Sequence, residues 1–97
     1  MVQSSSRQQH ATAALEVQRR AAHRLHAVPA AQRRTEPVRV LRQALGFTIG
    51  VAVAATGDFT LLRELAESGD ADLEWVVREN LKKSRLSAWP DEIAALR

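Results

Sequence analysis

Two Gly-Asp pairs, Gly57-Asp58 and Gly69-Asp70, divide the second half of the chain into helical stretches separated by very short turns. Glycine is favoured just past the C-terminus of a helix, and aspartate is favoured as the N-cap of the next one. Helices that are joined by such short turns pack as antiparallel neighbours. In a chain with almost no strand signals, this punctuation predicts an all-α fold of antiparallel helix pairs.

The helix before the first pair is expected to begin at Pro37, because proline is well tolerated in the first turn of a helix. Its apolar residues recur at helical spacing on two faces, which predicts an inner helix sandwiched between neighbours. Gly46 and Gly50, four residues apart, predict that another helix packs closely against this one. One face consists of Val38, Leu41, Leu45, Ile49 and Val53, and the other of Val40, Ala44, Phe47, Val51 and Ala54.

Three further helices are expected: a short one over 59–68, a longer one over 71–85, and the first turns of another over 90–96. The helix over 71–85 has acidic residues in its first turn and basic residues in its last, which suits the helix dipole at both ends. Its buried face should consist of Leu73, Val76, Val77, Asn80 and Leu81.

The first 35 residues are expected to be a peripheral basic arm, and residues 36–97 to hold the folded core. Met1 to His10 is polar and is predicted to be disordered, and Ala11 to Val28 forms at most a loose, alanine-rich helix that ends at Pro29. Residues 1–45 contain eight arginines and two glutamates, a balance of +6, against −3 for residues 46–97. The arm is expected to be solvated, and the alternatives are a surface for nucleic acid or an acidic partner, or an organellar transit peptide.

Composition excludes several classes of protein. The chain has no cysteine, which excludes disulfides, thiolate metal sites and cysteine nucleophiles. The longest apolar run, Ala44 to Ala55, is shorter than the roughly 20 residues that cross a bilayer, and the N-terminus lacks the apolar segment of a secretory signal. A cytoplasmic protein without membrane contact is therefore expected.

The string from Trp75 to Leu86, W-V-V-R-E-N-L-K-K-S-R-L, together with the acidic loop from Asp70, is similar to the closing stretch of bacterial HEAT-repeat proteins. The segments 37–39 and 44–46 resemble the opening and middle of a HEAT unit. The resemblance covers about residues 36–86, and it is more distant to the DNA-alkylation-repeat proteins. It implies a short HEAT-like right-handed α-solenoid stack that binds other macromolecules. Arg39 matches an arginine that bridges neighbouring units in the family, whereas Glu74 stands in that place in the later unit.

Four residues are candidates for partner contacts: Arg39, Trp75, Arg78 and Lys82. Trp75 and Glu79 would resemble the aromatic and acidic residues of DNA-alkylation-repeat glycosylases, but Glu79 is also four residues before Lys83, a routine helix ion pair. His23 and His26, three apart, could share a face toward a metal, but no third ligand has suitable spacing. No catalytic, cofactor or metal site is predicted, and the chain is not expected to be an enzyme.

Two functions remain open at this point. The first is a non-enzymatic interaction or scaffold module that binds a protein partner, and the alternative is a nucleic-acid-binding solenoid fragment related to the DNA-alkylation-repeat glycosylases. The position of the basic residues distinguishes them, because a nucleic-acid surface needs its cations on one face. The residues that decide are Arg33, Arg34, Arg39, Arg78 and Lys82.

Overall fold

The structure, a computed structural model, describes residues 2–97, and it describes side chains from Gln9 onward. Over these residues the chain is helical and has no strand, which confirms the predicted all-α class. The helices are α1 (Val2–Ala27), α2 (Glu36–Thr56), α3 (Thr60–Ala66), α4 (Ala71–Leu81) and α5 (Pro90–Leu96), with 3-10 turns η1 (Ala30–Gln32) and η2 (Ser84–Leu86).

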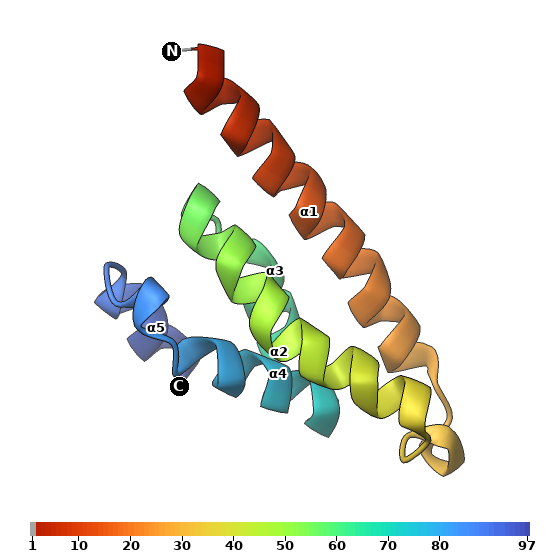
Figure 1. The fold of residues 1–97 in the computed structure, drawn as a ribbon. Helices are drawn as coiled ribbons and strands as arrows, with labels where there is room; N and C mark the ends of the chain where they lie inside the picture. The colour runs from red at the N-terminus through yellow and green to blue at the C-terminus, as the bar shows by residue number, and fades with distance from the viewer. Residues whose placement is uncertain (1) are drawn as a thin grey trace.

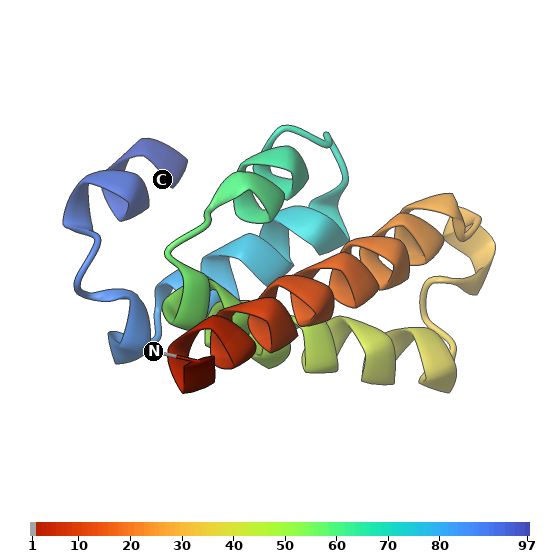
Figure 2. The same cartoon turned by 90° about the horizontal axis from the view of Figure 1, so that it is seen from above.

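Helix α2 lies between α1 and α4 (Figure 1) and packs extensively against both. Helix α1 runs antiparallel to α2, and the short helix α3 packs against both α1 and α4 (Figure 2). Helices α2 and α4 run parallel, as their contacts show. Arg42, early in α2, pairs with Asp72, early in α4, and Gly50, later in α2, contacts Asn80, later in α4. The chain reverses direction before α3 and again after it, and these two reversals make the parallel pairing of α2 and α4 possible.

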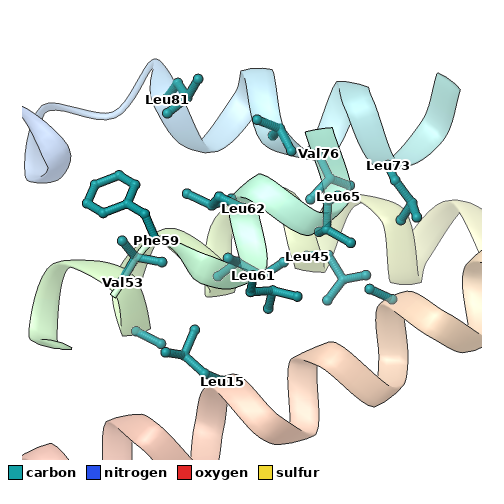
Figure 3. Packing of buried hydrophobic residues seen from close by; sticks show 14 of the residues in the cluster. Leu15, Leu45, Val53, Phe59, Leu61, Leu62, Leu65, Leu73, Val76 and Leu81 are labelled. Atoms are coloured by element: carbon teal, nitrogen blue, oxygen red, sulfur yellow. The ribbon is translucent and has the colours of Figure 1, made fainter. Parts of the chain in front are cut away.

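The core is a single cluster of aliphatic side chains with one buried phenylalanine (Figure 3). Leu61, Leu62 and Leu65 project from α3 into the space between α1, α2 and α4, and each is almost completely buried. Phe59 closes the cluster near α5, where its ring packs edge-on against Trp89 at a centroid distance of 5.7 Å. The other buried members are Leu15, Ala22, Leu25, Leu45, Ile49, Ala52, Val53, Leu73, Val76, Val77, Leu81 and Leu86.

The expectation of a peripheral N-terminal arm is wrong for the helix over 11–27. Leu15, Ala22 and Leu25 are buried in the same cluster as the residues of α2 and α3. These three residues form a narrow buried face on α1, which packs against α2 and α3, whereas Val17 on the same helix is 63% exposed. The segment predicted to be disordered is helical from Val2 onward, and Met1 lies outside the described residues.

Most of the predicted helix boundaries agree with the structure to within about two residues. Asp58 was predicted as the N-cap of α3, but the N-cap is Phe59, and the Asp58 carboxylate accepts the Thr60 N–H just before the helix. Gly57 ends α2 with φ of 72°, a left-handed conformation that favours glycine. The carboxylate of Asp70 accepts the backbone N–H groups of Asp72 and Leu73 as the N-cap of α4. Helix α4 ends earlier than predicted, at Leu81 rather than near Arg85, and the chain turns through η2 so that Leu86 is fully buried.

Candidate binding surface

Helix α2 carries an exposed apolar stripe on its solvent side. This α2 stripe consists of Val40, Ala44, Phe47 and Val51, spaced four, three and four residues apart, and Val40, Phe47 and Val51 are 55%, 52% and 47% exposed. Helix α2 does lie between two neighbours, α1 and α4, but the expectation that both of its apolar faces are covered is wrong. Its buried residues are Leu45, Gly46, Ile49, Gly50, Ala52 and Val53, and the face of the stripe is left open. A row of half-exposed valine and phenylalanine on a stable helix is a surface to which another apolar surface can pack.

Basic groups lie beside the α2 stripe. The guanidinium of Arg85 stacks over the ring of Phe47, 4.5 Å from its centroid, and its Nη1 donates to the Phe47 carbonyl oxygen at 3.3 Å. Arg39, next to Val40, is exposed and forms no ion pair with any described residue. Glu36, at the start of α2, is the only acidic residue of that helix. The surroundings of the stripe are therefore predominantly cationic.

Trp75 lies at the contact between α2 and α4 and is partly buried. The guanidinium of Arg42 stacks on its ring, 3.7 Å from the centroid, and Arg42 Nε lies 3.0 Å from Asp72 Oδ1 as an ion pair. A Cβ added at Gly46 would lie 3.1 Å from the Trp75 ring. The predicted close approach at Gly46 is thus confirmed, and Trp75 is the side chain that occupies the space.

Arg78 and Lys82 line a different surface, a pocket of about 490 Å³ on the side of α4 that faces α3 and α5. Val77 and Leu81 of α4 and Leu96 of α5 form its apolar wall, and Glu74 lies among its lining residues. Lys82 pairs with Glu79 at 2.6 Å, so the predicted partner of Glu79, Lys83, is replaced by the residue before it. The four residues predicted to contact a partner therefore do not gather at one site.

Arg33 is withdrawn from the surface into an ion cluster that the sequence analysis did not identify. Its guanidinium donates to both carboxylate oxygens of Asp70 and to Asp72, each at 2.9 Å, and also to the carbonyl oxygens of Val28 and His26. His26 Nδ1 lies 2.9 Å from Asp70 Oδ2, and the Asp70 side chain is only 6% exposed. The hydrogen bonds from Arg33 hold the pKa of Asp70 well below its ordinary value.

The cluster joins the connection between α1 and α2 to the first turn of α4. In the sequence, only Asp70 pointed to this cluster, because an N-cap aspartate has a second carboxylate oxygen that can bind a cation. Arg33 is 37 residues away, too far for any helical periodicity to connect the two residues. The arginine that bridges to the aspartates is thus Arg33, with Arg42 beside it, rather than Arg39.

The structure gives the two histidines separate surroundings. His26 faces Asp70, while His23 is exposed on α1. In the described part of the chain, no three or more histidine and acidic side chains are grouped so that they could hold a metal ion.

Comparison with known proteins identifies no relative: no protein-family model, curated protein or solved structure matches this chain. Among the described helices, α2 is long and apolar enough to cross a membrane, with a mean hydropathy of 1.4 over its best window. The apolar run from Ala44 to Ala55, which is too short to cross a bilayer, is only part of this helix. Of the residues in the best window, 33% are buried, on the face where α2 is in contact with α1 and α4.

Proposed function

We propose that this chain is a non-enzymatic interaction module, a short HEAT-like right-handed α-solenoid stack that binds a protein partner in the cytoplasm. The observation that carries the proposal is the α2 stripe, where Val40, Phe47 and Val51 remain about half exposed on a helix whose opposite face is buried. A small domain with few aromatic residues gains stability by covering such side chains, so their exposure favours an interaction role.

The packing of α2 and α4 supports the solenoid part of the proposal. The two helices are parallel, and their contacts pair residues about 30 positions apart, as in Arg42 with Asp72 and Gly50 with Asn80. A short antiparallel helix connects them. Stacked units of one helix pair each produce this kind of regular offset.

A nucleic-acid-binding solenoid is the second candidate, and the exposed arginines favour it. Arg20, Arg24, Arg34 and Arg39 are exposed without an ion pair to a described residue. Against it, Arg33 is engaged in the ion cluster, and Arg78 and Lys82 line the pocket on the far side of α4. The five basic residues that distinguish the two functions therefore do not all lie on one face of the molecule.

The test is an affinity capture from source-cell lysate with the full chain immobilised, with and without nuclease. The wild type is compared with Val51→Asp on the stripe and with Ala95→Asp, a matched charge on the exposed surface of α5. We expect a protein that is retained by the wild type and by Ala95→Asp after nuclease treatment and is lost with Val51→Asp. Capture that disappears with nuclease supports the nucleic-acid candidate, and capture unaffected by Val51→Asp contradicts the assignment to the stripe.

A further inference from the structure

We propose that the α2 stripe binds an amphipathic helix of another protein whose apolar residues are flanked by acidic side chains. This inference rests on the proposed interaction function and specifies the chemistry of the partner. Three features of the surface carry it: the spacing of the stripe, the distribution of charge around it, and the few aromatic side chains it contains.

The spacing of the stripe matches that of a second helix. Val40, Ala44, Phe47 and Val51 follow the four-three-four pattern that keeps one line of side chains on one face of a helix. From Val40 to Val51 the line is about 17 Å long, since each residue adds about 1.5 Å. Ala44, the smallest residue of the stripe, lies between Val40 and Phe47, and a larger apolar side chain of a facing helix can pack over it.

Charge complementarity favours an acidic partner. Arg85 stacks on Phe47 of the stripe, and the exposed Arg39 is next to Val40 in the sequence. Neither arginine forms an ion pair with a described residue. In the described chain, the acidic side chains that form ion pairs pair with other cations. Those of α1 and α3 pair with Arg19, those of α4 and its N-cap with Arg33, Arg42 and Lys82, and that of α5 with Arg63. The cations around the stripe are thus available to carboxylates of a partner.

Two other occupants are disfavoured, a second copy of the chain by its charge and a lipid surface by the composition of the stripe. In a two-fold contact between copies, the arginines beside the stripe of one copy would face those of the other, and Glu36 is the only acid on α2 to offset them. A lipid surface is bound best by helices with several large apolar side chains, whereas this stripe has one phenylalanine and otherwise valine and alanine.

The test uses the full chain with two synthetic helical peptides of about 20 residues, long enough to form a helix on binding. Both peptides carry the same leucine and alanine stripe, flanked by glutamate in one and by lysine in the other. Calorimetry measures each affinity at low and high salt, for the wild type, Val51→Asp and Ala95→Asp. Vesicles of anionic and of zwitterionic lipid, and sedimentation of the chain alone, test the other occupants.

We expect the glutamate-flanked peptide to bind about tenfold or more tightly than its lysine twin at low salt, with the difference shrinking as salt rises. Val51→Asp should abolish this binding and Ala95→Asp should retain it. Equal or absent binding of the two peptides overturns the inference, as does vesicle binding without peptide binding or self-association that Val51→Asp abolishes. If the peptides fail while a captured protein still depends on Val51, the proposed function stands and this inference falls; if both fail, both fall.

Discussion

The side-chain oxygen of Asn80 accepts the backbone N–H of Gly50 at 2.7 Å, so that a residue of α4 reaches into the backbone of α2. The amide nitrogen of Asn80 donates to the carbonyl oxygens of Leu45 at 3.0 Å and Val76 at 2.8 Å. Asn80 is completely buried, and its three hydrogen bonds satisfy a polar group that would otherwise be costly to bury. Glycine at position 50 leaves the space that this amide needs.

Gly50→Leu should lower the free energy of unfolding by roughly 1–3 kcal/mol or more, as expected for overpacking. A Cβ at this position would lie 2.7 Å from Asn80 Oδ1, so the buried Asn80 side chain would have to shift and its hydrogen bonds would be disturbed. Chemical denaturation measures the change. Ala44→Leu on the exposed face of the same helix is the control and should stay within about 0.5 kcal/mol. Equal stability of Gly50→Leu and the wild type would contradict the close contact.

Asn80→Ala should cost roughly 1–3 kcal/mol through the lost hydrogen bonds of a buried amide. It should also reduce the penalty of Gly50→Ala, because the clash of the new Cβ is with the Asn80 side chain. A double-mutant cycle measures this as a coupling of roughly 0.5–3 kcal/mol. Simple additivity of the two penalties would show that the two residues do not compete for the same space.

Trp75→Ala should lower the free energy of unfolding by roughly 2–4 kcal/mol, somewhat less than truncation of a fully buried ring. The ring is partly buried, and the substitution removes both the contact with Gly46 and the stacking of Arg42. Thermal unfolding and duplex-DNA affinity should be measured on the same samples. An unchanged midpoint together with lost DNA binding would instead assign Trp75 to a nucleic-acid surface.

Stability should fall in acid because the folded-state pKa of Asp70 is lowered, chiefly by its hydrogen bonds from Arg33. A depressed pKa stabilises the fold fully above the ordinary carboxyl value of about 3.9, and this contribution disappears as pH falls through that value toward the folded one. Urea midpoints from pH 7 to pH 2 should show the decline. Asp70→Asn should be less stable at pH 7 and should lose less on acidification than the wild type; Asp91→Asn, an exposed residue of α5, should keep the wild-type profile.

Leu25→Ala should cost roughly 2–5 kcal/mol, the range for truncating a buried leucine. Leu25 is completely buried although it belongs to the segment that composition marks as a solvated arm. Val17→Ala on the same helix, at a position that is 63% exposed, is the matched control and should change stability by less than about 0.5 kcal/mol. Similar small effects for both would show that α1 is not part of the folded core.

The sequence predicts the second half of the chain better than the first. The features of the second half depend on residues close together in the sequence, whereas the packing of the first half depends on residues far away in the sequence. The cap at Asp70 and the buried face of α4 follow from residues within a few positions, and all five residues predicted for that face are buried. Helix α1 has a stripe rich in alanine, and the area that an alanine buries is too small to distinguish a packed helix from a solvated one. Its packing depends on α2 and α3, which periodicity within α1 does not reveal.

The candidate surface was predicted incompletely for the same reason. The residues of the α2 stripe were identified as apolar and helical, but spacing alone does not show which of two apolar faces a neighbour covers. Arg39 was identified by its charge and sequence context, while the engagement of Arg33 by Asp70 depends on a contact between segments far apart in the chain. Trp75 was identified from the sequence as a candidate for partner contacts, whereas in the structure it packs between α2 and α4, against Gly46 and Arg42.

The Arg33 cluster gives the two ends of the molecule unequal resistance to local opening. It ties the first turn of α4 to the connection between α1 and α2, whereas α5 has no fully buried residue and rests mainly on α3. Backbone amides of α5 should therefore exchange with solvent deuterium before those of α4. Leu96 and Arg97 line the pocket beside α4, so each opening of α5 would remove part of the pocket's wall. During such an opening, the apolar side chains of α4 that line the pocket would be exposed to solvent.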